Sequence, residues 1–293
     1  MSAIDASTPR PVVRSRAARA RAAVVRPLLL PFAWSLAAFD VFVISWMFLG
    51  SFKTTRELLL EPFGLPREWM FVNYAEAWRA AHLGDGVLNS VILVLASGVL
   101  ILVIAAPAAY ALSRFGGRGS GALSVLFILG LGVPVQTMVL PLYVMFRQVG
   151  LIDSILGLVI INVGVGIPYA FFLLTAFFRS IPHEIEESAA IDGASTSYTF
   201  WRISLPLVRS GLITVFVLQA IGHWGETFFA LVMLPTQETV SLSLLNFMQS
   251  MQASGARYSV LFAGLSIVVI PLLVLYIWLG SRMIEGIAQG YSK

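Results

Sequence analysis

Six stretches of the chain are almost purely apolar and long enough to cross a lipid bilayer. A transmembrane helix needs about 20 predominantly apolar residues. The stretches that meet this length are residues 27–50, 87–112, 122–146, 154–178, 211–234 and 258–281. Shorter, more polar segments separate them. The pattern therefore predicts an all-α integral membrane protein with six transmembrane helices.

Polar side chains are rare inside the predicted helices. Asp40 lies in the first, and Gln219, His223, Trp224 and Glu226 lie in the fifth. An ionisable residue in a membrane helix is costly and is a functional hypothesis by default. The group in the fifth helix suits a sugar pathway, because carboxylates accept hydrogen bonds from hydroxyls and Trp stacks on sugar rings. A structural hydrogen bond between helices is the alternative, and we favour packing for Asp40.

The composition excludes several classes of protein. The chain is 58% hydrophobic and 12% charged, with a mean hydropathy of +0.86, whereas a soluble domain has about 25% charged residues. It has no cysteine, which excludes disulfides, thiolate metal sites and thiol nucleophiles. His183-Glu184 lacks a second His at helical spacing, so it is not a zinc-protease motif. No catalytic triad is evident, so we expect neither an enzyme nor a metal site.

The distribution of basic residues predicts the orientation. With the N-terminus inside, 13 Lys and Arg lie on the cytoplasmic side and 6 outside, as the positive-inside rule requires. Both termini and the loop 179–210 are then cytoplasmic, and the loop 51–86 is outside. Residues 1–26 form an Arg-rich cytoplasmic tail that we expect to be disordered. The first apolar run is too long for a signal peptide, so residues 27–293 form one transmembrane domain.

The loop 179–210 predicts two short helices joined by a turn. Pro182 suits the first turn of a helix, where its missing N–H costs nothing. Asp192-Gly193 is a stop-and-turn signal, because Gly adopts positive φ at low cost. Either Ser195 or Thr196 can cap the second helix.

The first of these helices has an acidic start and a small-residue end. Glu184, Glu186 and Glu187 lie near the positive end of the helix dipole. Ala189 and Ala190 are small, so a partner surface can approach the backbone closely. The element is therefore suited to being held by another protein.

The loop resembles the EAA motif of the permease subunits of ABC importers. The residues that carry the resemblance are Glu187, Ser188, Ala189, Ala190, Asp192, Gly193, Ala194, Leu205 and Pro206. Other segments resemble the carbohydrate-importer branch of that family, namely residues 51–53, 110–115, 141–143, 150–153, 224–226 and 286–293. The likeness covers about residues 27–293. Ser188, Ser210 and Gly225 depart from the commoner Ala, Pro and Asn of the family.

The resemblance implies a type I ABC importer permease in a bacterial or archaeal-type plasma (inner) membrane, moving a sugar or oligosaccharide. It implies a heterodimer with a second permease, two copies of a cytoplasmic ATPase and an extracytoplasmic solute-binding protein. The first loop helix would dock in a cleft of the ATPase, where Glu187 would pair with a basic group and Gly193 would provide the turn. The chain has no Walker A loop, so ATP would bind the partner subunits and this chain would hold no cofactor. The outer loop 235–257 would face the binding protein.

Three other functions remain open. The same machinery could carry a non-sugar solute such as a glycerol phosphodiester or a polyamine. The chain could be a stand-alone secondary transporter, although it shows no evident internal repeat and few intramembrane charges for ion coupling. It could also be a membrane scaffold without a transport role.

Overall fold

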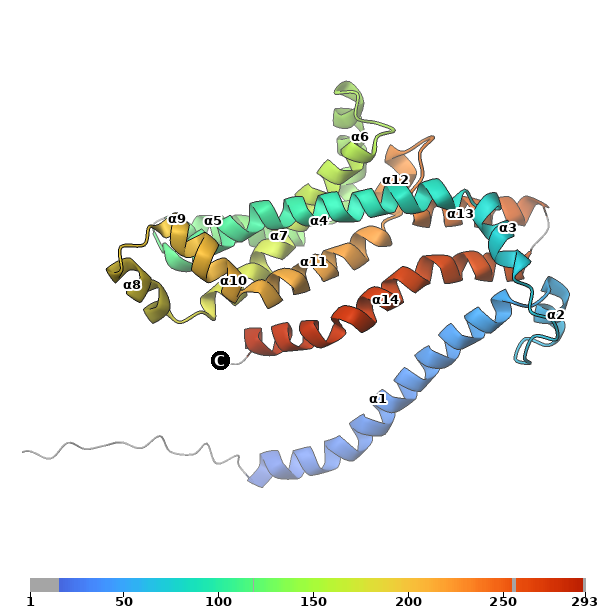
Figure 1. Cartoon of the computed structure of the whole chain (residues 1–293), viewed down its shortest axis with the longest axis horizontal. Helices are drawn as coiled ribbons and strands as arrows, with labels where there is room; N and C mark the ends of the chain where they lie inside the picture. The colour runs from blue at the N-terminus through green and yellow to red at the C-terminus, as the bar shows by residue number, and fades with distance from the viewer. Residues whose placement is uncertain (1–15, 118, 255–256, 292–293) are drawn as a thin grey trace, which may run out of the picture.

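The chain folds into an all-helical bundle (Figure 1). The computed structural model describes residues 16–117, 119–254 and 257–291, with side chains described for 30–117, 119–251 and 257–278. The longer helices are α1 (Arg16–Ser51), α4 (Leu83–Arg114), α5 (Ser120–Gly132), α6 (Val139–Gln148), α7 (Ile155–Arg179), α11 (Arg209–Trp224), α13 (Val240–Ser254) and α14 (Tyr258–Tyr291). The shorter elements are α2 (Thr55–Leu60), α3 (Val72–Ala80), η1 (Val135–Met138), α8 (His183–Ile191), α9 (Thr196–Thr199), η2 (Phe200–Ser204), α10 (Leu205–Leu207) and α12 (Phe228–Met233).

The helices include the membrane spans that the apolar pattern predicts. Four described helices, α1, α4, α7 and α14, are long and apolar enough to cross a membrane. Two bent helix pairs, α5 with η1–α6 and α9–α10 with α11, raise this number to six if each pair is one span. The predicted all-α membrane fold is confirmed, and two of the spans differ in form from the prediction.

The third apolar stretch, 122–146, is a broken helix. α5 ends at Gly132, and the following segment is bent from it by 89°. Val133 has φ −77° and ψ 121°, the extended conformation that a residue before proline prefers. Pro134 therefore breaks the helix, whereas Pro141 lies within α6 without ending it.

The fifth apolar stretch, 211–234, is not a continuous helix either. α11 ends at Trp224, and α12 begins at Phe228 after a break of three residues. Gly225 occupies the C-cap position of α11, and glycine is common at helix ends because it carries no Cβ. Our placement of Glu226 inside a helix is therefore wrong.

The first helix starts earlier than the sequence suggested. α1 begins at Arg16, so the expectation of a disordered tail is wrong for residues 16–26, while residues 1–15 lie outside the described part of the chain. The physical reason is composition, because Ala and Arg are both strong helix formers. The tail is rich in both residues.

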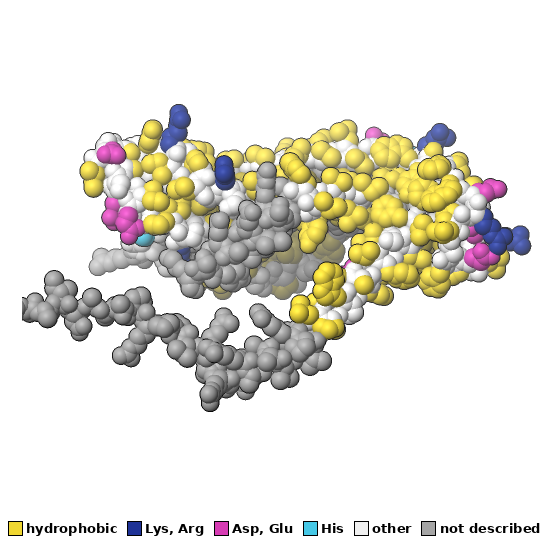
Figure 2. Space-filling model, turned by 60° about the horizontal axis from the view of Figure 1, so that its bottom comes forward, with side chains coloured by type: hydrophobic (Ala, Val, Ile, Leu, Met, Phe, Trp, Pro, Cys, Tyr) yellow, Lys and Arg dark blue, Asp and Glu magenta, His cyan; other side chains and the backbone are white. Residues whose placement is uncertain are grey.

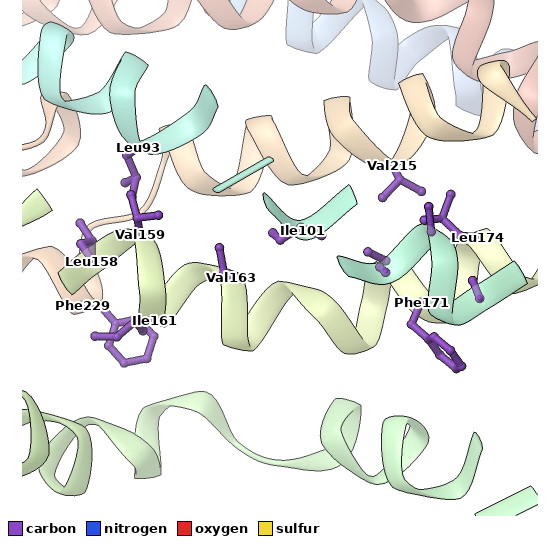
Figure 3. Close-up of a cluster of buried hydrophobic side chains, with 14 of the residues drawn as sticks. Leu93, Ile101, Leu158, Val159, Ile161, Val163, Phe171, Leu174, Val215 and Phe229 are labelled. Atoms are coloured by element: carbon purple, nitrogen blue, oxygen red, sulfur yellow. The ribbon is translucent and has the colours of Figure 1, made fainter. Parts of the chain in front are cut away.

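The core lies where α4, α7 and α11 pack together (Figure 3). Leu93 and Ile101 of α4 and Leu158 and Leu174 of α7 belong to one hydrophobic cluster, and all four side chains are fully buried. Glycine permits the close approach: a Cβ at Gly166 of α7 would lie 2.5 Å from Cδ1 of Ile101. Small residues at helix contacts are typical of membrane bundles. We call these three packed helices the frame, and the loops connect to its ends.

α1 stands apart from this frame. It diverges from α14 toward its N-terminal end (Figure 1), and none of its most apolar window is buried. Figure 2 shows a largely hydrophobic surface between two ends where most of the charged side chains in that view gather. Such a surface needs lipid or protein against it. Asp40 is among the exposed residues of α1.

The two ends of the bundle carry different elements. The start of α1, the end of α14 and helices α8–α10 share one end, and α2, α3 and α13 lie at the other (Figure 1). The sequence predicts six membrane spans, and an even number of spans returns the chain to the side on which it began. At the second end, the buried Lys53 donates from Nζ to the carbonyl oxygens of Glu61 (2.7 Å) and Pro62 (3.3 Å). The loop 51–86 is thus a folded cap.

Candidate functional site

The loop between α7 and α11 contains the helix, turn and second helix that its sequence predicts. α8 follows Pro182, which occupies the N-cap position with φ −56° and ψ 137°. Glu184 and Glu186 lie in the first turn of α8, where carboxylates favour the positive end of the helix dipole. The hydroxyl of Ser188 donates to the carbonyl oxygen of Glu184 at 2.7 Å, one turn back along the helix.

The turn after α8 depends on one glycine. Gly193 has φ +81°, a conformation that residues with a Cβ rarely adopt. The N–H of Ala194 donates to the carbonyl of Ala189 at 2.9 Å, and that of Gly193 to the carbonyl of Ala190 at 3.0 Å. Such bonds satisfy the free carbonyls at the end of a helix. Ser195, one of the two caps considered, accepts a hydrogen bond from the N–H of Tyr198 at 3.3 Å.

One face of α8 is open. Of the residues that carry the EAA resemblance, Ala189 is buried, Ala194 and Leu205 are half-buried, and the others are exposed: Glu187, Ser188, Ala190, Asp192, Gly193 and Pro206. Ile191 is 87% exposed, which is unusual for a large apolar residue on a short polar helix. A hollow of about 560 Å³ lies beside it, lined by Ala189, Asp192, Gly193, Ala194, Ser195, Tyr198 and Ile203. The arrangement offers an apolar and acidic surface to another molecule.

The side of α8 that contacts α4 holds the residue that sequence reasoning missed. We assigned Glu186 only to the helix dipole, but its carboxylate pairs with Arg114 at the end of α4, with 3.0 Å between Oε1 and Nε. The Arg114 side chain is 3% exposed and that of Glu186 14%. The spacing of Tyr110 and Arg114, which places both on one face of α4, was the available signal. The sequence alone does not say which of the three glutamates they meet.

The polar residues of the fifth apolar stretch are engaged in contacts within the chain. Gln219 donates from Nε2 to the carbonyl of Gly166 on α7 at 2.8 Å, and Trp224 donates from Nε1 to that of Val268 on α14 at 3.0 Å. The carboxylate of Glu226 accepts the backbone N–H groups of Phe229 (2.7 Å) and Ala230 (3.0 Å), and so caps α12.

His223 differs from these neighbours. It is 6% exposed, and its Nε2 has no hydrogen-bond partner among the described residues. A buried polar atom without a partner costs free energy. His223 is therefore the one member of the predicted pathway set whose side chain lacks a hydrogen-bond partner for a buried polar atom among the described residues.

Comparisons with a protein family and with individual proteins both find membrane transport proteins similar to this chain. The family described as binding-protein-dependent transport system inner membrane component matches residues 98–285, a range that includes α8. The chain is 33% identical over 270 residues to the diacetylchitobiose uptake system permease protein NgcG of Streptomyces coelicolor, covering 92% of this chain and 88% of that protein. It is 29% identical over 252 residues to the trehalose transport system permease protein SugB of Mycobacterium tuberculosis, covering 85% and 91%.

A solved structure supports the fold. One chain of a bacterial ABC transporter involved in the import of the acidic polysaccharide alginate superposes with a TM-score of 0.73 and 23% identity. The match covers 92% of this chain and 99% of that chain. The two chains therefore share their helical architecture throughout.

Proposed function

Because the chain belongs to the family of binding-protein-dependent transport system inner membrane components, we propose that it is the permease subunit of an ATP-driven sugar importer. It translocates a sugar or oligosaccharide that an extracytoplasmic binding protein delivers. Relatives named for diacetylchitobiose and trehalose support the solute class. The chain is a transport subunit, and two copies of a separate ATPase bind and hydrolyse ATP.

The observation that carries the proposal is the open face of α8. The Gly193 turn presents Glu187 and Ile191 outward from the bundle, and Glu187 offers a carboxylate to a basic group of the ATPase. This end of the bundle, with both chain termini, is on the cytoplasmic side. A second permease packs beside this one, where it covers part of the exposed apolar surface.

The fifth apolar stretch supplies polar groups to the solute pathway. Gln219, His223, Trp224 and Glu226 are the members of this set, and the buried Nε2 of His223 has no hydrogen-bond partner within the described part of the chain. A Michaelis constant for uptake that is unchanged in His223→Ala would remove His223 from the pathway.

The test of docking is co-purification. In Glu187→Ala, the amount of ATPase that co-purifies in mild detergent falls, because the docking carboxylate is lost, while membrane insertion is unchanged. Loss of one charged contact between proteins typically reduces affinity by about tenfold or more. Glu184→Ala, which removes an exposed carboxylate from the same helix, is the matched control.

The test of transport is reconstitution. The complex in proteoliposomes should take up a radiolabelled saccharide, from a panel that includes diacetylchitobiose and trehalose, only with ATP. Uptake of a glycerol phosphodiester or a polyamine instead would change the solute class. Uptake driven by an ion gradient without the ATPase would overturn the proposal.

A further inference from the structure

One carboxylate connects three segments at the α8 end of the bundle. Oε1 of Glu186 accepts hydrogen bonds from Arg114 Nε at 3.0 Å and from Ser204 Oγ at 2.7 Å. Its Oε2 accepts one from the hydroxyl of Tyr110 at 3.3 Å. Tyr110 and Arg114 belong to α4, Glu186 to α8 and Ser204 to η2. We call these four residues the carboxylate joint.

Arg114 contacts the segment that precedes α8 as well as α8 itself. Its Nη2 donates to the carbonyl oxygen of Ile181 at 3.0 Å, and Nη1 lies 3.4 Å from Nε2 of His183. The guanidinium therefore reaches the residues on both sides of Pro182, the last of the three residues between α7 and α8. A planar group with five donors can make such contacts at once, whereas a lysine ammonium is a single point charge.

Aromatic rings fix the position of the joint. The ring of Tyr110 lies 5.5 Å from that of Phe178 on α7 and 5.0 Å from that of Phe200 on η2, centre to centre. Phe178 and Phe200 are both buried. η2 is a π-helix, a rare element that is frequent at functional sites. The joint is thus embedded in packed side chains rather than lying on the surface.

A displacement of α8 cannot leave α4 unaffected. Separating Glu186 from Arg114 would leave the buried Arg114 side chain without its carboxylate partner, which is strongly unfavourable. α4 packs on both α7 and α11 in the core. Among the described residues, the side chain of Glu187 makes no hydrogen bond or ion pair with the bundle and is exposed, so the two neighbouring glutamates have different surroundings.

We propose that the carboxylate joint transmits the movement of α8 to the membrane-spanning helix α4. Glu186 and Arg114 are then positioning residues for coupling, and Glu187, the exposed next residue of α8, is the docking residue. The inference rests on the proposed function, because it assumes that α8 is moved by an ATPase.

The experiment measures whether α8 and α4 move together. The chain has no cysteine. Two cysteines introduced by Glu184→Cys on α8 and Ala111→Cys on α4 are therefore the only sites of this subunit at which a spin label attaches. Both positions are exposed. With the joint intact, the distance between the labels in the assembled complex should be narrow and the same with and without a non-hydrolysable ATP analogue. In Glu186→Gln it should broaden and shift when the analogue is added, although the ATPase remains bound.

A neighbouring variant separates this inference from the proposed function. Glu187→Gln makes the same chemical change one residue along, and should lower the recovery of the ATPase while leaving the distance narrow. If Glu187→Gln lowers recovery but Glu186→Gln leaves the distance unchanged, the joint is overturned and docking stands. If neither Glu187→Gln nor Glu187→Ala lowers the recovery of ATPase, the proposed function of α8 fails, and the joint with it.

A double variant covers the case in which Glu186→Gln does not fold. Arg114→Met with Glu186→Met removes both charges, so no unpaired charge is left buried, and such replacements are often tolerated. The assembled double variant should show the same broad, nucleotide-dependent distance. A narrow, constant distance in the double variant would overturn the inference, because the ion pair would then serve folding alone.

Discussion

The two ends of α7 are each held by one carboxylate, and the partners of these carboxylates differ. Before α7, Asp153 accepts hydrogen bonds from the backbone N–H groups of Thr236 (2.9 Å) and Gln237 (3.0 Å) and from the Thr236 hydroxyl. After α7, Glu186 pairs with the buried guanidinium of Arg114. Both contacts join segments that are far apart in the sequence.

The difference lies in burial and charge. The Asp153 contacts are at least partly exposed, and the Thr236 hydroxyl, followed by the two backbone N–H groups, holds the pKa of Asp153 below its ordinary value of 3.8. Exposed contacts of this kind contribute little to stability. The Arg114 contact is buried, so its loss leaves a charge without a partner. The end of α7 at which we propose ATPase docking is thus the more firmly connected one.

The largest expected effect comes from removing the buried cation. Arg114→Ala should destabilise the protein by up to about 3–5 kcal/mol, because the largely buried carboxylate of Glu186 loses its cationic partner. The midpoint of thermal unfolding in detergent measures this loss. Adding Glu186→Ala should restore much of it, and Arg147→Ala, at an exposed position on α6, is the control. An Arg114→Ala protein as stable as the Arg147→Ala control would contradict the claim that the Glu186 contact stabilises the protein more than the Asp153 contact at the other end of α7.

Two glycines with positive φ give the next comparison. Gly193→Ala after α8 and Gly150→Ala before α7 place a Cβ at φ +81° and +70°, each at a cost of about 1–2 kcal/mol. Neither Cβ would meet another atom within 4 Å, so backbone strain is the shared cause. Both variants should be less stable, but only Gly193→Ala should lower the recovery of ATPase.

A further substitution refines this result. Gly193→Asn should do less harm than Gly193→Ala, since Asn tolerates the left-handed conformation. Equal loss of ATPase recovery in Gly150→Ala and Gly193→Ala would show that the turn after α8 has no special role in docking.

The smallest effect is expected at Asp153. A carboxylate whose pKa is lower in the folded protein adds stability above its ordinary pKa, and this stability is lost as the pH falls through the folded pKa. Asp153→Asn should therefore lower the unfolding midpoint slightly at pH 7. The difference from the parent should begin to shrink below pH 3.8, the ordinary value, and should vanish only once the pH is below the lowered pKa of the folded protein. A difference that persists at lower pH would mean that the charge of Asp153 is not what holds this end.

The sequence predicts local features well and contacts between distant segments poorly. Apolar length predicts the four long spans but not the breaks in the other two, and the Asp192-Gly193 signal predicts the turn after α8. The role of Glu226 as a cap of α12 was missed, because the break after Trp224 depends on three residues in an otherwise apolar run. The spans, the turn after α8 and the break after Trp224 all depend on residues that are close together in the sequence.

The pairing of Glu186 is a different kind of failure. Glu186 and Glu187 are chemically equivalent neighbours in the sequence, and Arg114 is 72 residues away. Which glutamate faces it depends on how α4 packs against α7 and on the angle at which α8 leaves the bundle. A pattern along one chain contains neither quantity, so the pair could not be predicted from the residues alone.

The most direct test of the account is photo-crosslinking from α8. A photoreactive amino acid at Ile191, which is 87% exposed, should crosslink in native membranes to an ATPase that carries a Walker A motif. The same amino acid at Trp69, an exposed position between α2 and α3, should not capture it. An ATPase captured from Trp69 but not from Ile191 would contradict the claim that α8 is the element on which the ATPase acts.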